Sequence, residues 1–129
     1  MKNKIFINDI KFKFHERKLS IENIINDDKF ILNLHDIYIK FIECFNNGNK
    51  LIFCGNGGSA ADCEHIVAEF IVKLSKLRKS LPAISLTSNS SIITAISNDI
   101  EYKNIFTRQL EGIAKTNDVL IGISTSGNS

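Results

Sequence analysis

The spacing of apolar and polar positions changes along the chain and divides it into two kinds of sequence. Between residues 30 and 41 the apolar residues recur every three or four positions and form one helical stripe: Phe30, Leu34, Ile37 and Phe41. The polar run Asn46–Asn49 predicts the end of this helix. Upstream of Phe30, the apolar positions follow a less regular pattern, which also predicts a helix. From Lys50 onwards, short apolar runs alternate with longer mixed segments, as in parallel strands that are separated by helices.

The second part of the chain is therefore expected to be α/β, with a doubly wound parallel sheet. The predicted strands are Leu51–Cys54, Ala83–Leu86 and Asp118–Ile123, and the predicted helices are Ser59–Arg78, Ser91–Ser97 and Asn104–Ala114. In the first of these helices Ile66, Val67, Phe70 and Leu74 are expected to face inward. The last strand is apolar on both faces and reads as a buried central strand.

A glycine-rich turn follows the first strand, with the sequence Gly55-Asn56-Gly57-Gly58. Glycine tolerates positive φ and lets the backbone approach a ligand closely. Ser59 is a predicted N-cap of the next helix, with Asp62 as its capping partner. Free N–H groups at a helix N-terminus favour an anion such as phosphate. An ordinary tight turn between strand and helix is the alternative interpretation.

The helix that follows carries His65 and Glu69 four residues apart, so the two side chains share one face. We expect them in its first turns, at the end that points to the ligand. An imidazole and a carboxylate can bind a divalent metal or perform acid–base chemistry. A solvated surface pair is the alternative, and Glu64 is expected to face elsewhere.

A second polar loop follows the last predicted strand. Its hydroxyl side chains suit phosphate oxygens, and they belong to Ser124, Thr125, Ser126 and Ser129. Ligands of open α/β sheets bind beyond the carboxyl ends of the strands. Because both loops follow strands of one parallel sheet, we expect them at the same edge, where they would hold one phosphorylated ligand between them.

Composition narrows the choice of partner and compartment. The net charge of the 129-residue chain is +2, which argues against a nucleic-acid-binding surface. Three cysteines without metal-type spacing, Cys44, Cys54 and Cys63, fit reduced thiols and a cytoplasmic location. Charges interrupt the apolar start of the chain, so neither a signal peptide nor a membrane-spanning segment is expected.

Four segments in sequence order resemble the sugar isomerase (SIS) domain of phosphoheptose isomerases: GNGGSAADCEHIVAE, LPAISLT, ITAISND and DVLIGISTSGNS. The resemblance runs from about Lys50 to Ser129. It implies conversion of sedoheptulose 7-phosphate to D-glycero-D-manno-heptose 7-phosphate, for the heptose of lipopolysaccharide or capsule. It also implies a flavodoxin-like fold and a homotetramer in the cytoplasm, with no nucleic-acid or membrane partner.

The resemblance assigns roles to individual residues. Glu69 matches the catalytic carboxylate, and His65 and Glu69 match two ligands of one zinc ion per subunit. The matched substrate-binding positions are Asn56, Gly57, Gly58, Ser59, Glu69, Asn98, Asp99, Ser124, Thr125, Ser126 and Ser129. The remaining zinc ligands, a Gln and a His on a late helix, are expected beyond residue 129. Lys73 stands where the family usually has Arg, so the role of that position is open.

The same comparison divides the chain into two expected regions. Residues 1–49 would form a helical oligomerisation segment, and residues 50–129 a partial SIS domain that binds the phosphosugar. A chain that ends inside the phosphate loop is expected to be inactive alone. Two alternatives remain: a non-catalytic SIS protein, which senses phosphosugars or binds the replication initiator, and another phosphosugar enzyme of this fold. The presence of Glu69 favours an enzyme.

Overall fold

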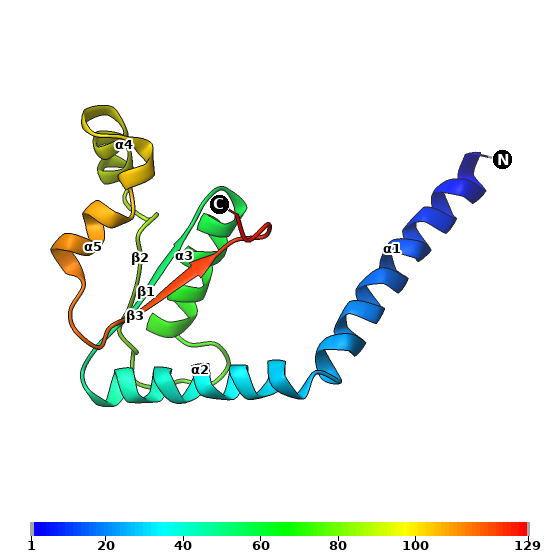
Figure 1. Cartoon of the computed structure of the whole chain (residues 1–129), viewed down its shortest axis with the longest axis horizontal. Coiled ribbons are helices and arrows are strands. Elements are labelled where there is room, and N and C mark those ends of the chain that lie inside the picture. Colours follow the sequence, from blue (N-terminus) through cyan, green and yellow to red (C-terminus); the bar gives the residue numbers. More distant parts are fainter. Residues whose placement is uncertain (1, 129) are drawn as a thin grey trace. The chain divides into compact units, whose positions relative to one another are not determined.

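The computed structural model describes residues 2–128 of the chain, with side chains from residue 6. It begins with two long helices, α1 (Lys2–Ile25) and α2 (Asp28–Asn46) (Figure 1). The Asp27 side chain accepts a hydrogen bond from the Phe30 backbone at the start of α2. The chain divides into two compact units, and the boundary along the sequence falls within α2, between Ile39 and Lys40. No helix in residues 2–128 combines the length and apolar character that crossing a membrane requires.

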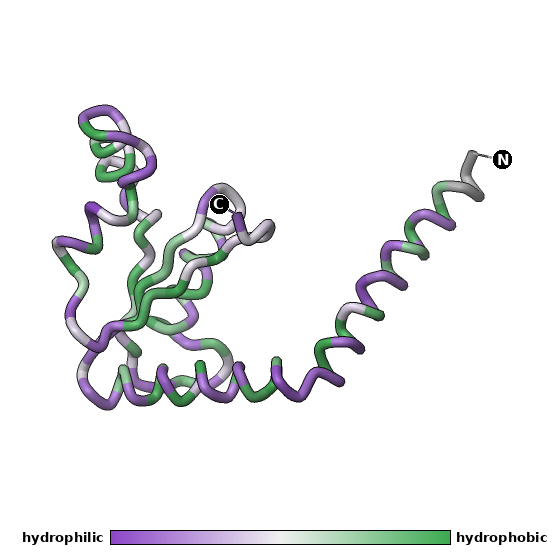
Figure 2. The backbone as a smooth tube through the Cα atoms, viewed as in Figure 1, coloured by the Kyte–Doolittle hydropathy of each residue, from purple (hydrophilic) through white to green (hydrophobic). Residues whose placement is uncertain are grey.

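A three-stranded parallel sheet organises the second unit, in the order β2-β1-β3. Its strands are β1 (Leu51–Gly55), β2 (Ala83–Ser85) and β3 (Val119–Ile123) (Figure 1). Leu51 pairs with Ala83 on one side and with Val119 on the other. The three strands are green in Figure 2, as expected for apolar runs that form the centre of a sheet. The structure confirms the predicted parallel α/β fold.

Helices connect the strands in the predicted alternation. They are α3 (Gly58–Ile71), α4 (Ser90–Asp99), the short 3-10 helix η1 (Tyr102–Asn104) and α5 (Thr107–Ile113). The Asn89 side chain caps α4 by accepting a hydrogen bond from the backbone of Ile92. The predicted helix over 104–114 is wrong in detail, because Asn104 ends the 3-10 helix η1 and α5 begins only at Thr107 and ends at Ile113.

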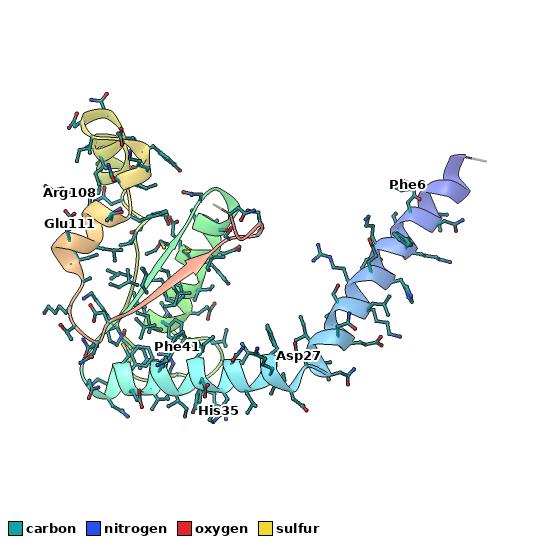
Figure 3. All side chains as sticks on the ribbon, viewed as in Figure 1. Phe6, Asp27, His35, Phe41, Arg108 and Glu111 are labelled. Atoms are coloured by element: carbon teal, nitrogen blue, oxygen red, sulfur yellow. The ribbon has the colours of Figure 1, made fainter. Side chains whose placement is uncertain are left out.

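The core of the second unit lies between the sheet, α3 and the end of α2. Its buried residues are Cys44, Leu51, Phe53, Cys63 and Ala83. The Phe70 ring of α3 lies 5.9–6.3 Å from three other rings, those of Phe41, Phe45 and Phe53. Figure 3 labels Phe41, which lies on the side of α2 toward the sheet. The predicted apolar stripe of α2 thus ends in aromatic packing against α3.

The β3 strand differs from the prediction of a strand buried on both faces. Alternate residues Val119, Ile121 and Ile123 pack against the core, whereas Leu120 points to the other face and is 51% exposed. The central strand is β1, in which Ile52 and the residues on either side of it in the chain are all buried. In the described sheet β3 is an edge strand, covered on one face.

Helix α3 is shorter than predicted and ends at Ile71, seven residues before Arg78. Arg78 explains the early end, because its guanidinium donates hydrogen bonds to the backbone carbonyls of Glu69 and Phe70 at 2.7 and 2.8 Å. A basic side chain thereby satisfies carbonyls that a longer helix would have bonded. Leu74, predicted to face inward, lies after the helix and is 78% exposed.

Gly55 lies where α3 and β3 approach each other closely. A Cβ atom at this position would come within 2.9 Å of Ser59 Cβ and 3.0 Å of the Ile123 carbonyl oxygen. A Cβ atom added at Gly112 in α5 would instead meet no other heavy atom within 4 Å. We predict that Gly55→Ala lowers the free energy of unfolding by roughly 1–3 kcal/mol. The matched Gly112→Ala should raise it by about 0.5–1 kcal/mol. Urea unfolding of both variants checks this, and a Gly55→Ala chain as stable as the parent would contradict it.

Candidate functional site

The glycine-rich turn after β1 leads directly into α3. Gly57 adopts φ +57°, which a residue with a side chain rarely does, and it is the N-cap of the helix. The predicted N-cap Ser59 is wrong: Ser59 lies inside α3, is 6% exposed and makes no capping bond. The Asn56 carbonyl accepts the Ser59 N–H at 3.0 Å. The Asn56 side chain, at the start of this turn, is half-buried.

The two predicted phosphate loops begin side by side. Gly55 pairs with Ile123, so Asn56 and Ser124 leave neighbouring strands at the same level, about 4.8 Å apart in backbone spacing. In the second loop, the Gly127 N–H donates to Ser124 Oγ at 2.9 Å and the Asn128 N–H to Ser126 Oγ at 3.2 Å. These bonds fold the loop into a tight turn with Gly127 at φ +73°. Thr125 is exposed in this turn, and the predicted Ser129 lies outside the described residues.

His65 and Glu69 share one face of α3, as the spacing predicts. His65 Nε2 lies 3.8 Å from Glu69 Oε1, and the His65 side chain is 77% exposed against 31% for Glu69. Their expected place in the first turns is wrong for Glu69. Because α3 ends at Ile71, Glu69 lies in its last turn, roughly 16 Å along the axis from Gly58 at a rise of about 1.5 Å per residue. Within one chain, the turn and this carboxylate lie toward opposite ends of α3.

Glu69 has one oxygen that is buried without a partner. Oε2 is the buried side-chain oxygen in the described residues that no hydrogen bond satisfies. The carboxylate lines a pocket of about 460 Å³, whose other walls are His65, Ile66, Phe70, Leu74, Arg78 and Leu81. A buried polar atom without a partner is costly, so natural proteins tend to keep one where a ligand or a reaction uses it. The arrangement leaves this oxygen available to a metal ion, a proton or a substrate.

The His65–Glu69 pair fits part of a zinc site. An imidazole nitrogen and a carboxylate oxygen are both usual zinc ligands, and such sites take four ligands in a tetrahedron. The described residues contain no group of three or more His, Cys, Asp or Glu side chains that could hold a metal. Burial raises the pKa of the Cys54 and Cys63 thiols, which favours their protonated form. The pair supplies half of a tetrahedral set.

Asn98 and Asp99, assigned by resemblance, occupy the last turn of α4. Both are exposed, and Asn98 Nδ2 donates to Asp99 Oδ1 at 2.8 Å. The following helix η1 connects this region to the glycine-rich turn, since the Tyr102 hydroxyl donates to Asn56 Oδ1 at 3.0 Å. Lys73 lies in the exposed segment after α3.

Sequence reasoning missed two residues at the site, Tyr102 and Arg78. Tyr102 fell between two predicted helices and has no periodic neighbours that would single it out. For Arg78, the sequence pattern predicts only the end of a long helix. A signal for Arg78 did exist, because a basic residue shortly before Pro82 can cap helix carbonyls.

Comparison with known proteins identifies the family to which this fold belongs. The family model described as "SIS domain" matches residues 21–129, which is most of the chain and begins within α1. The chain belongs to the SIS domain family. The phosphosugar turn expected from the sequence resemblance therefore lies in a SIS domain.

Named relatives of this SIS chain are phosphoheptose isomerases. The Clostridium acetobutylicum phosphoheptose isomerase is 54% identical over 84% of this chain and 55% of its own length. The corresponding enzyme of Pelobacter propionicus is 43% identical over 95% of this chain and 64% of its own. The solved phosphoheptose isomerase of Neisseria gonorrhoeae superposes with a TM-score of 0.85 at 32% identity, covering 96% of this chain and 63% of that one. The SIS chain thus spans between about half and two thirds of these relatives.

Proposed function

We propose that this SIS protein is a ketose–aldose isomerase that converts sedoheptulose 7-phosphate to D-glycero-D-manno-heptose 7-phosphate. The observation that carries the proposal is the Glu69 carboxylate, which lies beside His65 with one oxygen buried and without a partner. The names of the relatives support the substrate. The product would supply heptose for lipopolysaccharide or capsule.

Glu69 would act as the base that moves the proton. Ketose–aldose interconversion transfers a proton between adjacent carbons through an enediolate, and one carboxylate can serve both carbons from one face of the sugar. The pocket walls Ile66 and Phe70 limit water around this carboxylate. The remote phosphate would supply binding energy that positions the reacting carbons.

Zinc is the proposed metal, with His65 Nε2 and a Glu69 carboxylate oxygen as two of its ligands. When bound, zinc polarises a carbonyl or hydroxyl group of the substrate. The imidazole of His65 is exposed enough to meet ligands from outside α3. Further ligands would come from outside the His65–Glu69 pair.

The phosphate would bind at the edge where Asn56 and Ser124 leave adjacent strands. Because Glu69 lies at the other end of α3, a second copy of the chain could bring its own carboxylate to this edge. That arrangement fits the proposed cytoplasmic homotetramer. Exposed apolar side chains of α1, among them Phe12, Phe14 and Ile21, offer an interface for assembly. Figure 3 labels Phe6, another exposed apolar residue of α1.

The isomerase proposal is tested in D2O by proton NMR with sedoheptulose 7-phosphate and zinc. The assay uses this chain and, beside it, a chimera that continues with the C-terminal part of the Clostridium relative. Aldose formation with deuterium at the reacting carbon is the expected result in the chimera, whereas this chain alone is expected to bind the phosphosugar without turnover. Binding without turnover or exchange in both chains would instead indicate a phosphosugar sensor.

The second loop gives a separate prediction. Ser126→Ala removes a hydroxyl that would bond the phosphate, and a hydrogen bond to a charged group contributes roughly 1.5–3 kcal/mol. We expect the dissociation constant for sedoheptulose 7-phosphate, measured by calorimetry, to rise roughly ten- to a hundredfold. The control is Ser20→Ala, which removes an exposed hydroxyl of α1. Unchanged affinity in Ser126→Ala would refute a phosphate role for this loop.

A further inference from the structure

The hydrogen bond between Tyr102 and Asn56 joins two parts of the site that lie 46 residues apart in sequence. We propose that Tyr102 is a positioning residue that sets the orientation of the Asn56 carboxamide, so that the turn presents an N–H donor to the phosphorylated ligand. This inference rests on the proposed function, because it assumes that the turn binds the phosphosugar.

The chemistry of the carboxamide gives the direction of the effect. An asparagine side chain has an acceptor oxygen and a donor NH2 group, and it can turn by half a rotation to exchange them. Tyr102 donates to Oδ1 of Asn56 at 3.0 Å. In this orientation the oxygen lies toward the phenol and the two Nδ2 hydrogens lie on the opposite side. A donor at this place suits phosphate or sugar oxygens, whereas a rotated carboxamide would present an acceptor to an anion.

Tyr102 is held well enough to serve this purpose, although the residue is 57% exposed. Ile105, three residues later, is buried at 3% exposure, and its N–H bonds the Tyr102 carbonyl at 3.1 Å. Gln109 donates to the carbonyls of both Ile105 and Leu86, which ties this segment to the end of β2. The backbone is thus fixed to the sheet while the phenol reaches over the turn.

The tyrosine content of the chain gives a direct optical test. The chain has two tyrosines and no tryptophan, so Tyr38→Phe leaves Tyr102 as its single tyrosine. Inorganic phosphate and then sedoheptulose 7-phosphate are titrated into this variant while tyrosine emission is recorded. We expect a saturable change. The matched Tyr102→Phe chain, which retains the exposed Tyr38 of α2, should show none.

Calorimetry on the same chains measures how Tyr102 acts. Tyr102→Phe should weaken binding of both ligands roughly three- to tenfold, as expected for one hydrogen bond, with the urea midpoint unchanged. In an Asn56→Ala background the Tyr102→Phe change should add nothing, because the group that it orients is gone.

The possible outcomes separate this inference from the proposed function. Unchanged affinity in Tyr102→Phe, or equal weakening in the Asn56→Ala background, would overturn the positioning role. If neither ligand binds the parent chain, both proposals fall. If inorganic phosphate binding depends on Tyr102 but sedoheptulose 7-phosphate binds no more tightly than inorganic phosphate, the positioning role stands and the proposed substrate is wrong.

Discussion

Glu69→Gln is expected to abolish isomerisation while phosphosugar binding persists. The amide keeps the shape of the side chain, but it replaces one acceptor oxygen with an NH2 donor and cannot accept the substrate proton. General acid–base catalysis contributes about 10²–10⁴-fold, so the rate should fall at least about a hundredfold. Deuterium exchange at the substrate carbon should disappear with it. Both are measured by NMR in D2O, in whichever of the two assayed chains turns over.

The neighbouring Glu64 supplies a matched control for this prediction. It is exposed on the same helix, and Glu64→Gln makes the same chemical change away from the pocket. Near-normal rates are expected for this variant. If Glu69→Gln also isomerises at a near-normal rate, Glu69 is not the base. If it loses substrate binding instead, the carboxylate holds the ligand rather than moving its proton.

The part of the site that could be predicted from sequence is local. The apolar run Leu51–Cys54, the glycines after it and the four-residue spacing of His65 and Glu69 are all contained within 19 consecutive residues. Short-range backbone preferences therefore determine the strand, the turn and the shared helix face. The sugar and its reaction, by contrast, came from the resemblance, since no spacing identifies a stereochemistry.

The features that sequence reasoning missed depend on contacts between distant residues. Helix α3 continues in the sequence pattern through Leu74, but Arg78 folds back onto the carbonyls of Glu69 and Phe70 and ends it earlier. The register of the sheet pairs Gly55 with Ile123, and this pairing brings the two loops together. A hydropathy pattern fixes which face of a strand is buried, but it does not say which residue of another strand lies opposite.

A charged network joins the starts of β1 and β3 and determines part of the stability of this sheet. Asp118, whose side chain is 4% exposed, accepts hydrogen bonds from the backbone N–H groups of Lys50 and Lys115 and from Asn49 Nδ2. The Lys50 ammonium also donates a hydrogen bond to the Asp118 carboxylate. Burial alone would raise the Asp118 pKa, but these donors outweigh it and hold the pKa well below its ordinary value of 3.8.

Asp118→Asn should lower the free energy of unfolding by roughly 3 kcal/mol at pH 7, the low end for breaking a buried ion pair, because Lys50 remains 21% exposed. The new amide must also turn its NH2 group toward one of the donors that the carboxylate accepted. Urea unfolding measures the loss. Asp36→Asn is the matched control, since Asp36 is 75% exposed on α2 and its removal should change little.

The lowered Asp118 pKa also predicts how acid acts on this sheet. A group whose pKa is lower in the folded state stabilises that state fully above the unfolded pKa, and the contribution is lost as the pH falls through the folded value. The parent chain should therefore lose stability as the pH falls below about 4, where the unfolded carboxylate begins to take up protons. The Asp118→Asn variant has no carboxylate to titrate there, so its free energy of unfolding should fall less over the same range and approach that of the parent. Parallel pH profiles for the two chains would show that other carboxylates cause the acid sensitivity, and that the network does not hold β1 and β3 together.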